Sequence, residues 1–141
     1  MGFQHIPVLV EETMTLLRCE PGQIFVDATL GGGGHALEML QRTAPDGTLI
    51  GFEWDEEAIS EAKKTLMPYG ERVKIFRENF IHLPDLLKSI KVEQVDGILL
   101  DLGISSLQLE KEDRGFSLKG EGPLDMRMEN YQFLHILIAK A

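Results

Sequence analysis

Four consecutive glycines at residues 31–34 separate two segments of opposite character. Residues 24–28 form a short apolar run that carries Asp27 near its end, which is typical of a buried strand. Residues 35–42 have apolar side chains at helical spacing. Glycine permits a tight turn and close approach of a ligand, and a helix start offers free N–H groups and a positive dipole. The segment therefore predicts a site for an anionic group, either the pyrophosphate of a dinucleotide or the carboxylate of S-adenosylmethionine.

The glycine run alone does not decide between a binding site and a flexible turn. Gly31 and Gly33 match the first two glycines of the pattern G-x-G-x-x-G, and Ala36 stands at the third position as a small residue. If the turn binds a ligand, a valine at Gly33 is expected to abolish binding because its branched side chain would occupy the ligand's space.

Strands and helices are predicted to alternate along residues 1–102. The expected strands are residues 24–28, 48–53, 73–77 and 95–100, and the expected helices are residues 11–18, 35–42, 56–66 and 84–90. Such alternation favours an α/β fold with a partial doubly wound parallel sheet of strand order 3-2-1-4. The apolar strands predict helices on both faces of the sheet. The fourth strand would be an open edge, so the sheet is expected to be incomplete.

Three domains or segments are predicted. Residues 1–102 are predicted to form the cofactor-binding unit. Residues 103–128 are predicted to form a loop on the substrate side, and a loop of this length is expected to have a function. Residues 129–141 form an apolar and possibly helical tail.

Charge and composition restrict the partners. The net charge of −9 argues against binding to RNA or to a membrane by overall electrostatic attraction. RNA contacts must therefore come from a local basic patch, a missing segment or a partner. The single cysteine, Cys19, fits a reducing compartment and has no ligand-spaced neighbours, so no metal site is expected. Neither a signal peptide nor a membrane span is recognisable, and the cytoplasm is the expected location.

Three further residues stand at or near the ends of predicted strands. Glu53 lies about 20 residues past the glycines, where a carboxylate can accept both hydroxyls of a ribose; the alternative is a solvated residue in an acidic cluster that caps the next helix. Phe80 is placed to pack against adenine or, nearly as well, in the core. Asp101 lies at the predicted switch point, where it would bind cofactor or a substrate amine rather than cap its strand.

The later segments resemble the ribosomal RNA small-subunit methyltransferase H family. The resemblance spans residues 5–128 and is carried by HIPVL (5–9), DATLGGGGH (27–35), DGILLDLGISS (96–106), RGFS (114–117) and GPLDMRM (122–128). Unlike a glycine turn, the last two segments are not general features of nucleotide-binding folds.

The resemblance implies a Rossmann-like class I methyltransferase that transfers a methyl group from S-adenosylmethionine to N4 of a cytidine in small-subunit ribosomal RNA. The implied cofactor contacts are Gly33, Gly34, His35, Glu53, Phe80, Asp101 and Gln108. Asp101 is the candidate base, and the candidate substrate contacts are Ser105, Ser106, Arg114 and Arg127.

Two departures from the family pattern affect these expectations. Glu53 replaces the usual aspartate, which keeps the charge but adds a methylene. Family members are about twice as long, so this chain is expected to lack the last strands of the sheet and the helical insertion. One alternative is a non-catalytic fragment that binds the cofactor weakly or not at all. A second alternative is half of a nicotinamide-dependent oxidoreductase, but the loop after Asp101 argues against it.

Overall fold

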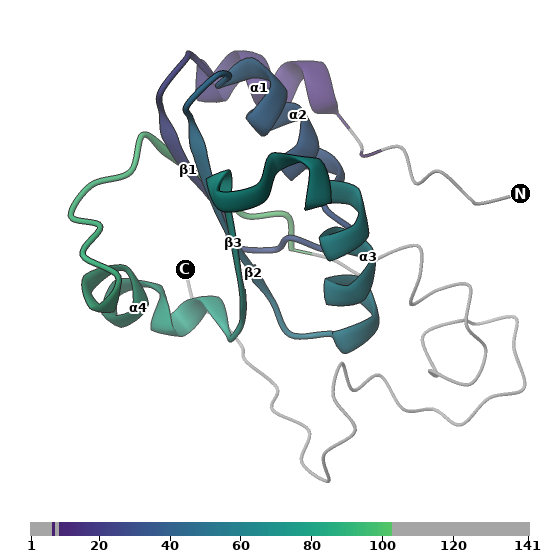
Figure 1. The fold of residues 1–141 in the computed structure, drawn as a ribbon, viewed down its shortest axis with the longest axis vertical. Helices are drawn as coiled ribbons and strands as arrows, with labels where there is room; N and C mark the ends of the chain where they lie inside the picture. The colour runs from purple at the N-terminus through teal and green to yellow at the C-terminus, as the bar shows by residue number, and fades with distance from the viewer. Residues whose placement is uncertain (1–6, 8, 103–141) are drawn as a thin grey trace, which may run out of the picture. The chain divides into compact units, whose positions relative to one another are not determined.

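A computed structural model describes residue 7 and residues 9–102, and its strands form one parallel sheet (Figure 1). The strands are β1 (Ile24–Asp27), β2 (Thr48–Glu53), β3 (Val73–Arg77) and β4 (Gly97–Leu99). Their order is β3-β2-β1-β4, and every pairing is parallel. The predicted fold class and strand order are therefore confirmed.

The helices are α1 (Val10–Leu17), α2 (Gly34–Arg42), α3 (Glu56–Leu66) and α4 (Leu83–Ser89), with short 3-10 helices η1 (Met67–Arg72) and η2 (Phe80–His82). Helix α1 precedes β1, and the others connect successive strands, as the sequence pattern predicts. None of the helices within the described residues has the length and apolar character needed to cross a membrane.

Helix α3 shows why the local sequence sets these bounds. Asp55 precedes the helix, and its buried carboxylate accepts the N–H groups of Glu57 and Ala58, two donors that lack partners inside the helix. The apolar positions Ala58, Ile59, Ala62 and Leu66 then face the sheet.

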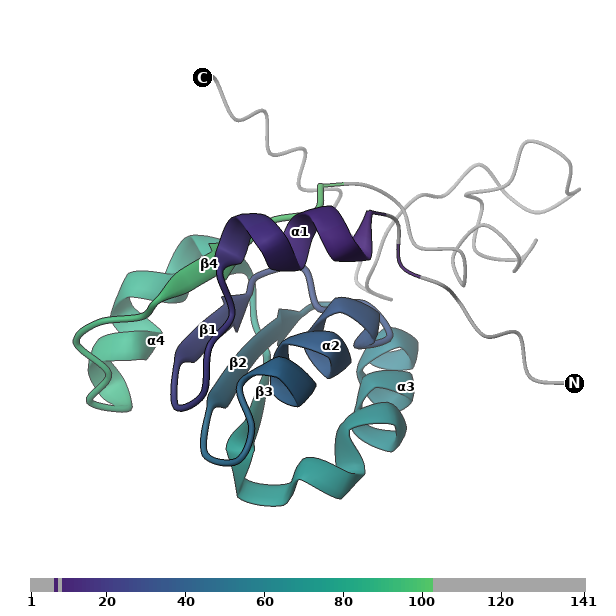
Figure 2. The ribbon, with the colours of Figure 1, turned by 90° about the horizontal axis from the view of Figure 1, so that it is seen from above.

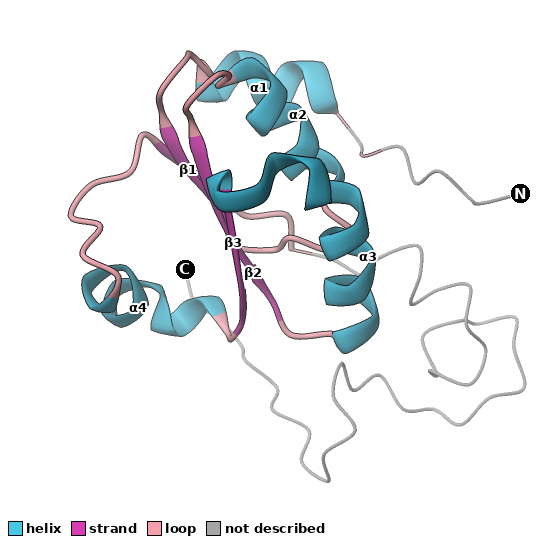
Figure 3. Ribbon diagram, viewed as in Figure 1, coloured by secondary structure: helices cyan, strands magenta, loops and turns pink. Residues whose placement is uncertain are grey.

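The two faces of the sheet differ in how completely helices cover them (Figures 2 and 3). Helices α1, α2 and α3 cover one face through a core that includes Met14, Leu40 and Leu66. On the other face, α4 packs against Val26 and Phe52.

The prediction that helices cover both faces is therefore confirmed. Near the β4 edge, which was expected to be open, Ile98 and Leu100 remain 43% and 50% exposed. Strand β4 is shorter than the predicted 95–100, since it pairs with β1 only from Gly97 to Leu99.

Candidate functional site

Three carboxylates lie at one edge of the sheet, where the parallel strands end. Asp27 is the last residue of β1, Glu53 is the last residue of β2, and Asp101 follows β4 by two residues. Because β1 lies between β2 and β4, the turns that follow these strands are neighbours. Open α/β sheets bind ligands at this edge, next to the strand from which the chain turns in both directions.

The glycine turn after β1 uses its glycines for two different reasons. Gly31 has φ +53°, and a Cβ built on it would find no atom within 4 Å, so the space in front of it is open. Gly33 has φ +86° and forms the N-cap of α2, where a Cβ would lie 3.3 Å from the Leu66 side chain. The reason expected for the valine substitution is therefore wrong, because a side chain at Gly33 points toward α3 rather than into a ligand space.

The start of α2 also lies against Pro7. A Cβ on Gly34 would be 2.6 Å from the Pro7 side chain, so this close approach requires glycine. His35 is the second residue of the helix and is half-buried. The predicted cofactor contacts Gly33, Gly34 and His35 therefore occupy one helix start, where the Gly33 N–H donates to the Leu30 carbonyl at 2.9 Å.

Glu53 connects two of the turns. Its Oε2 accepts the N–H of Gly31 at 2.8 Å, across the gap between β1 and β2. Its Oε1 accepts the N–H groups of Trp54 and Asp55 at 2.7 and 2.9 Å. Asp55 caps α3, so the capping role that the alternative interpretation gave to the neighbours of Glu53 is confirmed. Glu53 itself is a half-buried acceptor of three main-chain bonds.

A second connection joins the turns after β1 and β4. The Asp101 N–H donates to the Thr29 hydroxyl at 2.7 Å. The Thr29 N–H in turn donates to Oδ1 of Asp27 at 3.2 Å. The turn after β1 is thus joined to the turn after β2 by the Glu53 side chain and to the turn after β4 by the Thr29 side chain.

The charge at this edge is concentrated around Asp27, which is 1% exposed. Burial raises the pKa of Asp27 to about 7, the hydrogen bond from Thr29 opposes this shift, and the charges of Glu53 and Asp101 add to it. A carboxyl group in this state responds to any cation that arrives nearby, because a positive charge favours its ionised form.

The remaining predicted residues fall into two groups. Phe80 begins η2 after β3, is half-buried and packs against the core on the α4 side, a position that agrees with either of its interpretations. The others lie outside the described residues: Gln108, Ser105, Ser106, Arg114 and Arg127.

Sequence reasoning did not assign a role to Asp27 or Thr29. Both lie in the segment 27–35 that drew attention through its glycines. The available signal was a carboxylate at the end of a buried strand, followed two residues later by a hydroxyl. No group of three or more His, Cys, Asp or Glu side chains in the described part of the chain is placed to hold a metal ion.

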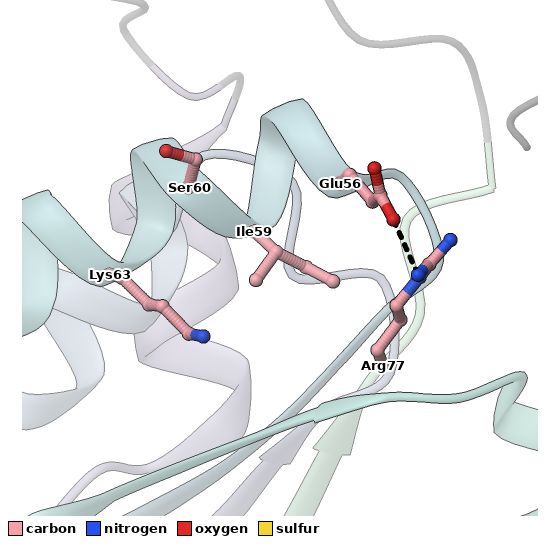
Figure 4. Close-up of a pocket in the computed structure, with 5 residues that line it drawn as sticks. All are labelled: Glu56, Ile59, Ser60, Lys63 and Arg77. Atoms are coloured by element: carbon pink, nitrogen blue, oxygen red, sulfur yellow. Dashed lines mark ion pairs between the residues drawn. The ribbon is translucent and has the colours of Figure 1, made fainter.

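Two surface hollows lie against α3 and β3. The larger, of about 330 Å³, is lined by Glu56, Ile59, Ser60, Lys63 and Arg77. Figure 4 shows Arg77 of β3 pairing with Glu56 at the start of α3, at 2.5 Å. Both partners are well exposed, so the pair contributes little to stability. We assign the candidate site to the three joined turns, because they carry the predicted residues.

Comparison with known proteins places these features in a family. The chain is 48% identical over 129 residues to "Ribosomal RNA small subunit methyltransferase H" of Symbiobacterium thermophilum and 51% identical over 126 residues to the protein of that name from Syntrophus aciditrophicus. These matches cover 92% and 89% of this chain but 41% and 40% of those proteins. The chain therefore spans about two fifths of the length of the curated relatives it matches.

Structural comparison agrees on the fold. The described sheet superimposes on a protein-L-isoaspartate O-methyltransferase with a TM-score of 0.57 at 19% identity, covering 70% of this chain and 30% of that one. The fold is thus the Rossmann-like fold of methyltransferases. The family model described as the MraW methylase family matches residues 2–136, and the chain belongs to this family.

Proposed function

We propose that this chain supplies the S-adenosylmethionine site of a methyltransferase that modifies the N4 amino group of a cytidine in small-subunit ribosomal RNA. The observation that carries the proposal is the joining of the turns after β1, β2 and β4 through Glu53 and Thr29. The names of the relatives support ribosomal RNA of the small subunit as the substrate, and we propose the cytoplasm as the location of the reaction.

The residues at the joined turns suit the parts of this cofactor. The start of α2 carries the positive end of the helix dipole, which suits its carboxylate. Open space before Gly31 leaves room for close approach to the main chain. Glu53 suits a ribose hydroxyl, although three of its roughly four acceptor positions are already used, so it can accept about one more bond. Phe80 offers its ring to the adenine.

The chain's own contribution to the reaction is mainly alignment. When bound, S-adenosylmethionine supplies a methyl group on a sulfonium that already activates it for transfer. Holding the acceptor amine in line with that group gives most of the acceleration. The amine of cytosine is a weak nucleophile because its lone pair is delocalised into the ring. The Asp101 carboxylate, exposed at the end of β4, is proposed to accept a hydrogen bond from the amine and to assist its deprotonation.

The RNA contacts are proposed for the segment after β4. Arg114 and Arg127 would contact phosphates, while Ser105 and Ser106 would orient the base. The target cytosine has to leave its stack to reach a carboxylate at the sheet edge. A net charge of −9 makes such local contacts necessary, because the chain as a whole repels RNA.

The first experiment measures cofactor binding by the single tryptophan. Trp54 follows Glu53 directly, so its fluorescence reports on the proposed ribose subsite. Titration with S-adenosylmethionine should give a saturable change, and NAD should give none. Tight NAD binding would favour an oxidoreductase, and a flat response to both would identify a fragment without cofactor affinity.

The second experiment compares the two aspartates that flank β4. Asp101→Ala should abolish methyl transfer to unmethylated small ribosomal subunits while leaving unfolding nearly unchanged. Asp96 lies at the opposite end of the strand, where its Oδ2 accepts the Ile24 N–H at 2.8 Å, so Asp96→Ala should lower stability but spare cofactor affinity. Nucleoside mass spectrometry should find N4-methylcytidine; another methylated nucleoside would refute the proposed specificity.

A further inference from the structure

The Thr29 hydroxyl continues the contact between β1 and β4 past the point where their main chains stop pairing. The last main-chain bond between them runs from the Ala28 N–H to the Leu99 carbonyl at 2.9 Å. The next donor along β4, the Asp101 N–H, meets the Thr29 side chain at 2.7 Å. A side chain thus replaces a main-chain acceptor where the two strands separate.

This bond lies at the point of the sheet where a ligand is expected. From β1 the chain crosses to β2 on one side, and β4 lies on the other side, so the winding direction changes between β1 and β4. Ligands of such sheets bind in the crevice at this change of direction. The hydrogen bond of Thr29 therefore joins the two turns between which a ligand is expected.

The threonine is itself held from the interior. Its N–H donates to the carboxyl group of Asp27, the buried last residue of β1. The path Asp27, Thr29, Asp101 links a buried group to an exposed one through two hydrogen bonds of 3.2 and 2.7 Å.

Loss of the Thr29 hydroxyl is expected to affect the reaction rate more than the free energy of unfolding. Asp101 is exposed, so water can satisfy its N–H when the threonine hydroxyl is lost. A hydrogen bond of this type contributes only about 1 kcal/mol to folding. A displacement of a reacting group by about 1 Å, in contrast, slows a reaction about a hundredfold.

We infer that Thr29 is a positioning residue that sets the main chain of Asp101, and thereby the placement of its carboxylate, for cofactor binding and methyl transfer. This inference rests on the proposed function. It assigns to Thr29 an effect on binding and rate that is larger than its effect on stability.

The test uses the 141-residue chain and three variants. Thr29→Val keeps the shape and removes the acceptor, whereas Thr29→Ser keeps the hydroxyl. Thr65→Val on α3 is the matched control. Thr65 is also half-buried, and its hydroxyl donates to the Glu61 carbonyl at 3.1 Å, away from the site. Each variant is examined by amide exchange of Asp101 in nuclear magnetic resonance, by titration with S-adenosylmethionine through Trp54 fluorescence, and by the methyl-transfer rate.

Thr29→Val should speed the exchange of the Asp101 amide and weaken cofactor affinity about tenfold, which corresponds to ~1.4 kcal/mol. Methyl transfer should fall further, while Thr29→Ser and Thr65→Val stay close to the unaltered chain. Unchanged exchange and affinity in Thr29→Val would overturn the inference while leaving the proposed function standing. Equal loss in the valine and serine variants would also overturn it. Failure of the unaltered chain to bind S-adenosylmethionine would instead refute the proposed function, and this inference with it.

Discussion

The Glu53 carboxylate accepts the Gly31 N–H at 2.8 Å, although Glu53 ends β2 and Gly31 lies in the turn that follows β1. The same carboxylate holds the main chain of Trp54 and Asp55 through its second oxygen. One side chain therefore fixes both the glycine turn and the turn that leads into α3. The methylene that distinguishes glutamate from the aspartate expected at this position gives the side chain additional reach across this gap.

Replacing Glu53 by glutamine should weaken both stability and cofactor affinity. An amide offers one acceptor oxygen instead of two, so either Gly31 or the Trp54 and Asp55 pair loses its partner. The expected loss in the free energy of unfolding is about 1–3 kcal/mol. Urea unfolding and titration with S-adenosylmethionine measure the two effects. Glu93→Gln, at an exposed position between α4 and β4, is the control. Identical curves for both variants would show that the Glu53 bonds do not persist in solution.

Two neighbouring glycines should respond very differently to alanine. Gly33→Ala places a side chain at φ +86° and 3.3 Å from Leu66, so unfolding should become easier by about 1–2 kcal/mol. Gly32→Ala meets only the Glu61 side chain at an ordinary 3.5 Å and should be nearly neutral. Thermal unfolding distinguishes them. If Gly33→Ala instead retains full stability but loses the cofactor, its side chain enters the ligand space after all.

Arg72 should matter more to stability than Arg42. The Arg72 guanidinium donates to the carbonyls of Gly47 and Leu40, both at 2.7 Å, and so joins the end of α2 to the turn before β2. Arg72→Ala leaves these acceptors without a partner and should destabilise the fold by about 2–3 kcal/mol. Arg42→Ala removes surface ion pairs to Glu11 and Glu38 and should change the urea midpoint less. The reverse order would contradict this assignment.

The fold could be predicted where residues next to each helix or strand mark its ends. The bounds of β2, α3 and β3 are confirmed, because a Pro-Asp-Gly turn, the Asp55 cap and the residues Pro68 and Gly70 separate these elements. Strand β4 was predicted too long. Its ends depend on contacts with residues about 70 positions away, such as Asp96 with Ile24 and Asp101 with Thr29, and no local pattern reveals such pairings.

The site was predictable as a set of positions but not as a set of bonds. A carboxylate at the end of a parallel strand must lie at the carboxyl edge of the sheet, and Glu53 and Asp101 do lie there. The partners of these residues depend on loop paths and rotamers. The sequence therefore could not show that Glu53 already holds Gly31, or that a side chain of Gly33 would meet α3 rather than a ligand.

The pH dependence of stability should identify Asp27 as a buried acid. Burial raises its pKa from 3.8 to about 7, so between these values the folded chain holds a proton that the unfolded chain has released. The contribution of Asp27 to stability is thus complete below pH 3.8 and is lost as pH rises through about 7. Asp27→Asn cannot ionise, so its advantage over the unaltered chain should grow by at most ~1.4 kcal/mol per pH unit and level off above neutrality. Urea unfolding of both proteins between pH 5.5 and 8.5 measures this difference. A difference that stays constant, or grows toward acid, would show that Asp27 is ionised in the folded chain throughout.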